Sequence, residues 1–289
     1  MSRPKTLIVA GATGYGAWPA NSLEGAGRCI AAPIDGIEID VQMTVDGQVI
    51  AHHDYWLNPD ATRLDGAWIT ERSAPLMTLS LETVRRYDIG RHRPGSEAET
   101  QHPDLASIDG ARIPTLPDLL TALAAAPGPR RLIYVEIKTH PNHPEYAPAP
   151  AGVTEAVAEA LEAADYVDHA KIIAFDWSVL RLAAARLPGV ATAHLTIPRR
   201  PGQPPAEHDS PWFDGCDPRH FGGSELAAIK AHGGMEWSPY YTDVSAERMA
   251  EADGLGLKAG PWGLGKSADI QRMLGLGVFS ATVSGPNWD

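Results

Sequence analysis

The stretch at residues 36–54, GIEIDVQMTVDGQVIAHHD, is the one around which we expect the rest of this chain to be arranged. It begins as an apolar run that carries two acids, Glu38 and Asp40. Residues two apart on a β-strand point to the same face, so the two carboxylates are expected to project side by side. Carboxylates held that close repel each other unless a cation lies between them or one of them takes a proton. The stretch therefore predicts a cation site on a strand.

The same stretch turns at Asp46-Gly47 and continues as a second short apolar run, which ends at His52, His53 and Asp54. An imidazole titrates near neutral pH, and a neighbouring carboxylate can orient it. Because adjacent side chains on a strand point to opposite faces, we expect His53 rather than His52 to lie with the acids. A cation site with an acid/base group beside it is typical of metal-assisted hydrolysis. The alternative is a plain polar cap at the strand end.

Strand and helix patterns alternate along the rest of the chain. Strands are expected at about residues 5–10, 37–41, 132–138, 171–175, 190–196, 235–239, 257–262 and 278–283. That alternation predicts a parallel sheet with right-handed crossovers. Eight repeats in 289 residues favour a closed barrel over an open doubly wound sheet, and the GATGYG turn after the first strand fits no dinucleotide fingerprint. We therefore expect an α/β fold, a (β/α)8 TIM barrel, as a single domain over residues 1–289.

One segment, at about residues 55–112, interrupts the alternation. It is rich in Pro, Gly, Asp and Arg, has one helical patch near residues 81–87, and is too long for a simple connection between a strand and a helix. We predict a small insertion after the second strand, lying over one end of the domain. The sequence IPTL at residues 113–116 then opens a helix that runs to about Ala126.

The strand after the insertion carries Glu136 and Lys138, again two residues apart and on one face. Barrel enzymes place their chemistry at the carboxyl ends of the strands, so Glu136 is expected to meet Glu38 and Asp40 there. Three carboxylates without a cysteine favour a hard cation, Mg²⁺ or Ca²⁺. Lys138 would hold an anionic oxygen of a substrate. The alternative is a buried ion pair in which Lys138 neutralises Glu136 while the other acids face solvent.

Two tryptophans lie at the ends of late expected strands, Trp237 on the sixth and Trp262 on the seventh. Each is either an apolar wall at the mouth of the barrel or part of the packed core, and the sequence leaves both possibilities open.

The composition limits the class of protein. The chain has 24 basic and 36 acidic residues and a formal charge of −12, which disfavours non-specific binding to nucleic acid. No apolar stretch is long enough to span a bilayer, the N-terminal stretch does not resemble a signal peptide, and two cysteines do not make a disulfide framework. We therefore expect a soluble, cytoplasmic protein whose oligomeric state the sequence leaves open.

Several motifs together resemble the glycerophosphodiester phosphodiesterases over nearly the whole chain. They are, in order, EID, DGQVIAHHD, LNPDATR, YDIGR, RIPTL, VEIK, FDW, WSP and a late PW. The resemblance implies a TIM barrel with a small inserted region, a place in lipid metabolism, and a small-molecule phosphodiester as partner. It also implies a reaction, the hydrolysis of a glycerophosphodiester to sn-glycerol 3-phosphate and an alcohol.

The resemblance also implies roles for individual residues. Glu38, Asp40 and Glu136 match the family's ligands for Ca²⁺ or Mg²⁺. His53 matches one of two catalytic histidines, the general acid for the leaving alcohol. As substrate-binding residues, Lys138 matches a lysine near the phosphate and Trp262 an aromatic residue on the glycerol side of the pocket.

The chain departs from the family pattern at the first strand. Family members end this strand with His-Arg-Gly and continue to Pro-Glu-Asn-Thr, whereas this chain has Gly11, Ala12 and Thr13 and then PANS at residues 19–22. Residues 4–27 contain neither histidine nor arginine, so no change of register restores the missing groups. The last strand also departs, because Val283 and Ser284 replace a Thr-Asp pair before Pro286, and GLG follows Trp262 in place of a Thr-Val-Asn type of run.

These departures leave three hypotheses. The first is a metal-dependent phosphodiesterase of this family with an altered site and an altered substrate. The second is an inactive barrel that serves as a binding or regulatory protein, and the third is a lyase that forms a cyclic phosphate. Losing a second acid/base histidine costs typically ~10²–10⁴-fold in rate, unless another group such as His194, or His92 or His102 from the insertion, replaces it.

Overall fold

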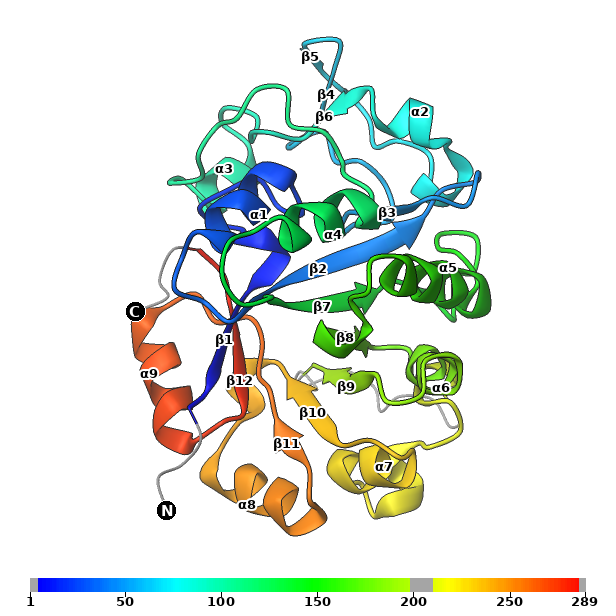
Figure 1. Cartoon of the computed structure of the whole chain (residues 1–289), viewed down its shortest axis with the longest axis vertical. Coiled ribbons are helices and arrows are strands. Elements are labelled where there is room, and N and C mark those ends of the chain that lie inside the picture. The colour runs from blue at the N-terminus through cyan, green and yellow to red at the C-terminus, as the bar shows by residue number, and fades with distance from the viewer. Residues whose placement is uncertain (1–4, 198–209, 286–289) are drawn as a thin grey trace.

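The computed structural model describes residues 5–197 and 210–285 (Figure 1). Most of the Pro-rich segment at residues 197–211 lies outside the described residues, as does Pro286.

Eight parallel strands form one ring within the described residues, in the order β11-β10-β9-β8-β7-β2-β1-β12. The first and last strands of the chain, β1 and β12, pair directly. On the other side of β12, the backbone N–H groups of Phe279 and Thr282 donate to the carbonyls of Ala259 and Pro261, which closes the ring. The predicted (β/α)8 TIM barrel is therefore confirmed. The strands are β1 (Leu7–Ala10), β2 (Gly36–Met43), β7 (Leu132–Ile137), β8 (Ala170–Ala174), β9 (Ala191–Thr196), β10 (Glu236–Pro239), β11 (Lys258–Ala259) and β12 (Ser280–Val283).

The strand β11 is shorter than the sequence predicts, because Pro261 has no N–H group to continue a β-ladder.

Helices surround the ring and bury its outer face (Figure 1). They are α1 (Leu23–Ile30), α4 (Leu116–Ala124), α5 (Pro150–Ala163), α6 (Trp177–Arg186), α7 (Glu225–Ala231), α8 (Ala246–Leu255) and α9 (Ser267–Leu276). The helix α4 begins later than the apolar pattern from Ile113 suggests. Thr115 and Asp118 form a reciprocal capping box there, which satisfies backbone N–H groups at the helix start and fixes the first turn.

The segment between β2 and α4 forms a small unit at one end of the molecule, at the top of Figure 1. Strand β3 (Val49–Ala51) runs antiparallel to β2, and a second sheet follows with the order β5-β4-β6. The strands of this second sheet are β4 (Arg63–Leu64), β5 (Ala67–Trp68) and β6 (Tyr87–Asp88). The unit also contains two short helices, α2 (Leu81–Val84) and α3 (Glu97–Gln101). The short helix α3 is absent from the sequence-based prediction. The insertion has its own apolar cluster, which includes Leu57, Leu76, Val84 and Ile113.

The interior of the ring is filled by residues that alternate along the strands. Val9, Tyr134, Ile173, Ala193 and Leu195 form an apolar cluster there. In this interior Lys171 donates from its ammonium to both carboxylate oxygens of Glu236, each at 2.7 Å. In the part of the chain described here, no helix is long and apolar enough to cross a membrane.

Candidate metal centre and active-site cavity

A cavity of about 390 Å³ opens where the strands of the barrel end at their carboxyl side. Five of the six site residues predicted from the sequence line it: Glu38, Asp40, His53, Glu136 and Trp262. The sixth, Lys138, does not line it. The ends of the barrel strands contribute one part of the lining, and the insertion contributes the other.

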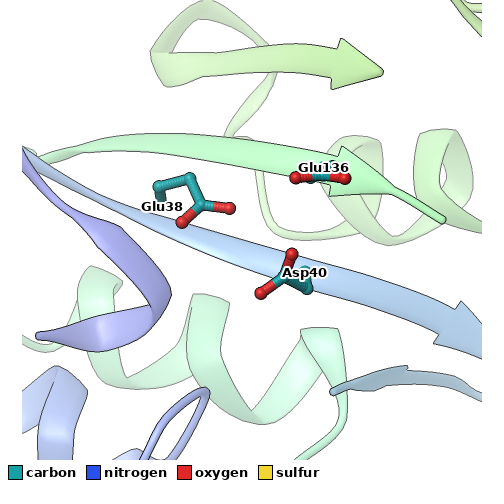
Figure 2. Close-up of side chains that lie close together, drawn as sticks. All are labelled: Glu38, Asp40 and Glu136. Carbon is teal, nitrogen blue, oxygen red and sulfur yellow. The ribbon is translucent and has the colours of Figure 1, made fainter. Parts of the chain in front are cut away.

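The three acids come together on two neighbouring strands. Asp40 on β2 lies directly opposite Glu136 on β7 in the parallel register, and Glu38 lies two residues earlier on the same face of β2 (Figure 2). One carboxylate oxygen from each residue lies within 4.8 Å of the others, and all three side chains are buried. The three carboxylates therefore converge, as the sequence predicts.

Lys138 lies among the acids and not at the cavity surface. Its Nζ atom is 2.8 Å from Oδ1 of Asp40 and 2.5 Å from Oε1 of Glu136. This contact is the ion pair that the sequence left open as an alternative. That alternative also placed the other acids in solvent, which is wrong, because Glu38 and Asp40 are buried.

The loop after β1 holds two of the acids in place. The backbone N–H of Ala12 donates to Oε2 of Glu38 at 2.7 Å. The Asn21 side chain donates to Oδ2 of Asp40 at 2.9 Å and accepts from the Asp40 backbone N–H at 3.0 Å. Asn21 is absent from the predicted site, although its match to the Asn of the family's Pro-Glu-Asn-Thr run was the available signal.

Burial and mutual repulsion shape the charge of the cluster. Burial, followed by repulsion from Asp40 and Glu136, raises the pKa of Glu38, and burial also raises the pKa of Glu136. Burial acts against ionisation of Asp40 too, but Lys138, His53 and Asn21 together hold the pKa of Asp40 below its usual value. With all acids ionised, three negative charges and one positive charge leave a net charge of −2, which a divalent cation balances.

His53 lies at the mouth of the cavity, and 66% of its side chain is exposed. Its Nδ1 atom is 2.7 Å from Oδ1 of Asp54, and attraction to Asp40 raises the pKa of His53. His52 lines the cavity as well, so the alternation of a strand does not separate the two histidines. The reason is that β3 ends at Ala51, so the alternation of a strand does not extend to these histidines.

The two tryptophans have different surroundings. Trp262 lines the cavity, and its ring centroid is 5.8 Å from that of Phe175 and 5.0 Å from that of Tyr240. Its buried Nε1 atom has no hydrogen-bond partner among the described residues. Trp237, in contrast, is fully buried outside the ring and donates from Nε1 to Oγ1 of Thr196 at 3.0 Å. Trp237 is therefore part of the packed core.

One wall of the cavity carries only small side chains. It is formed by the ends of β1 and β12, and its lining residues there are Gly11, Ala12, Thr282 and Ser284. Among the described residues that line the cavity there is no lysine or arginine. The wall that departs from the family pattern thus offers no cationic side chain to a phosphoryl group.

Of the three histidines considered as substitutes for the missing catalytic histidine, one lines the cavity. His194 cannot serve, because Ala193 and Leu195 point into the ring and His194 points outward against Trp177 and His232. His102 packs on Tyr15 but does not line the cavity. His92 does line it.

A model of the Glycerophosphoryl diester phosphodiesterase family matches residues 11–283. The chain belongs to this family. The match covers the three acids, the cavity lining except Ser284, and every barrel strand except β1, which precedes it. Family membership supports a phosphodiester hydrolase of the glycerophosphodiester type.

Solved structures give the same result for the fold. A candidate glycerophosphoryl diester phosphodiesterase from Silicibacter pomeroyi DSS-3 is 26% identical, with a TM-score of 0.85 over 98% of this chain and 90% of that one. An Oleispira antarctica phosphodiesterase in complex with the product sn-glycerol-3-phosphate is 14% identical, with a TM-score of 0.69 over 99% and 94%. A glycerophosphodiester phosphodiesterase from Agrobacterium tumefaciens C58 is 16% identical, with a TM-score of 0.65 over 98% of each chain. A search of curated proteins gave no match.

Proposed function

We propose that this protein hydrolyses a glycerophosphodiester to sn-glycerol 3-phosphate and an alcohol, with one divalent cation, Mg²⁺ or Ca²⁺, at Glu38, Asp40 and Glu136. The observation that carries the proposal is the close set of three buried carboxylates in a chain of this family. Carboxylate oxygens are the ligands that both cations prefer. We place the protein in the cytoplasm, as its composition predicts.

The donor set fits such a cation. Three carboxylates against one lysine leave two negative charges in a buried cluster, and an uncompensated buried charge is costly. The bound cation would supply positive charge to the phosphoryl oxygens. Lys138 holds Asp40 and Glu136 in position, and Asn21 holds Asp40.

The chain's own residues supply proton transfer and contacts to the substrate. His53, held by Asp54, donates a proton to the oxygen of the leaving alcohol as its bond to phosphorus breaks. Water supplies the oxygen that forms the new bond to phosphorus. Trp262 provides an apolar wall for the glycerol part of the substrate. The small wall at Gly11, Ala12 and Ser284 leaves room for a substrate group that a larger histidine and arginine would exclude.

Turnover of a panel of glycerophosphodiesters and of bis-p-nitrophenyl phosphate tests the proposal. We expect activity with Mg²⁺ or Ca²⁺, loss of activity with EDTA, and a fall of about 10²–10⁴-fold in His53→Ala. His143→Ala is the matched control, because His143 forms a similar exposed pair with Glu145, at 3.1 Å, but does not line the cavity. Absence of turnover together with metal binding would favour a binding or regulatory barrel, and a cyclic phosphate product would favour a lyase.

A further inference from the structure

The insertion contributes one titratable side chain to the cavity. Its lining residues are Asn58, Ala61, Thr62, Ile89, His92, Ala98 and Leu105, and His92 is the one member of this set that can take up or release a proton near neutral pH. The same cavity contains His53 and the three acids. Histidines from two different parts of the chain therefore line one space.

The backbone on both sides of His92 is firmly held. Ile108 donates from its backbone N–H to the carbonyl of Gly90 at 2.7 Å, and Arg93 donates in the same way to Asp60 at 2.6 Å. The side chain of Arg91, the residue before His92, donates to the Asp109 carboxylate at 2.6 Å. The backbone at His92 is thus held by contacts of its neighbours.

The ring has an unused nitrogen. Nδ1 of His92 is buried and has no hydrogen-bond partner within the described part of the chain. A buried polar atom without a partner costs free energy, and a turn of the ring that brings Nδ1 to the cavity would let a polar ligand there recover it. Burial also lowers the pKa of His92, so its imidazole is mainly neutral at pH 7 and able to accept a proton.

The insertion reaches the cavity beside the wall that departs from the family pattern. The Tyr15 ring, in the loop after β1, lies 6.1 Å from the His92 ring in an edge-on contact. The backbone of this loop is bound on one side to the insertion, where Ala106 donates to Ala17 at 2.9 Å. On the other side it is bound to the end of β12, where Gly285 donates to Tyr15 at 2.6 Å. The insertion thus brings an imidazole next to the loop that follows the first strand.

We propose that His92 contacts the phosphoryl group in the cavity and is the second proton-transfer residue of the hydrolysis, an inference that rests on the proposed function. His92 accepts a proton from the attacking water as the water oxygen bonds to phosphorus. His53 gives a proton to the alcohol oxygen as the bond between that oxygen and phosphorus breaks. Both histidines then return to their starting states by proton exchange with solvent, so atoms and charge balance.

The kinetic test compares wild type with His92→Ala, His92→Gln and His102→Gln. We expect kcat/KM to fall by about 10²–10⁴-fold in both His92 variants. We also expect the acidic limb of the wild-type pH profile to disappear in them. His102→Gln is the matched control, since its ring also packs on Tyr15, with centroids 4.3 Å apart, but lies outside the cavity lining. It should stay within about twofold of wild type.

A second readout needs no turnover. In wild-type protein labelled with ¹⁵N-histidine and loaded with Ca²⁺, sn-glycerol 3-phosphate should shift the His92 imidazole resonances and leave those of His143 unchanged. This measurement also keeps the proposal testable if a His92 variant does not fold.

Each outcome decides between the two proposals. Wild-type turnover with unaffected His92 variants overturns the role of His92 and leaves the hydrolase standing. A shift of the His92 resonances without wild-type turnover of any substrate supports contact with the phosphoryl group and overturns both the hydrolase and the proton transfer. Absence of both overturns both proposals.

Discussion

Asp40 and Glu136 are direct partners across the parallel pair β2 and β7, and the ammonium of Lys138 bridges their carboxylates. A parallel pair fixes which residues are neighbours, so the two acids are held together by the backbone and not by a flexible loop. Lys138 neutralises one charge of a cluster that still carries two more. The arrangement therefore makes both the stability of the fold and the binding of a cation depend on the same few side chains.

Lys138→Met should destabilise the folded protein when no cation is bound, and added cation should restore part of the lost stability. Removing the lysine leaves Asp40 and Glu136 buried without compensation, and breaking a buried pair costs about 3–5 kcal/mol. Saturating Ca²⁺ or Mg²⁺ should recover much of that loss, because a cation that binds the folded state stabilises it. Unfolding in urea, with EDTA or with cation, measures both free energies.

Lys171→Met is the control for this prediction. Lys171 is equally buried and paired with Glu236 inside the ring, but it lies outside the acid cluster. Its loss should cost a similar free energy that cation does not restore. Equal recovery of both variants by cation would contradict the assignment of the site.

Gly90→Ala should loosen the insertion. A Cβ atom at this position would lie 1.6 Å from the backbone oxygen of Ile108, so the two segments would have to separate, at a cost of about 1–3 kcal/mol. Gly27→Ala in α1 is the matched control, because its Cβ meets nothing within 4 Å and a helical Gly→Ala change stabilises by about 0.5–1 kcal/mol. Urea unfolding measures both, and opposite signs are expected.

The stability of the fold should fall with acid partly through His194. Burial, with a smaller contribution from His232, lowers the pKa of His194 from 6.5 to about 3. Between these two values the unfolded chain takes a proton at His194 and the folded chain does not, so the free energy of unfolding decreases as pH falls from about 6.5 toward 3. One proton corresponds to a slope of about 1.4 kcal/mol per pH unit.

The comparison of wild type with His194→Gln isolates this effect from the carboxylates that titrate in the same range. Urea unfolding in EDTA between pH 6.5 and 5 should show a steeper pH dependence in wild type than in the variant. Parallel curves would mean that His194 takes a proton in the folded state as readily as in the unfolded chain.

The sequence predicts the parts of the site that depend on short-range geometry. Glu38 and Asp40 share a face because of the two-residue period of a strand, and Glu136 joins them because the next barrel strand is parallel and in register. The same rule fails for His52, since the strand ends one residue before it. Side-chain directions in the site can therefore be predicted from the sequence where the strands are regular, but not beyond the strand ends.

Other features depend on contacts between distant segments. The position of Lys138 is decided by the charges around it, which pull a flexible side chain away from the cavity and onto the acids. The outward direction of His194 follows from the phase of β9 and from Trp177 and His232 on other elements. The approach of His92 requires the insertion to fold against the loop after β1, which no local pattern encodes.

Calorimetric titration of EDTA-treated protein with Ca²⁺ and with Mg²⁺ is the direct test of the metal centre at Glu38, Asp40 and Glu136. We expect binding of one ion per chain in wild type and no detectable binding in Asp40→Asn. Glu145→Gln, which changes an exposed acid outside the cavity, should bind as wild type does. Absence of binding for both cations in wild type, or unchanged binding in Asp40→Asn, would contradict the assignment of Glu38, Asp40 and Glu136 as a metal centre.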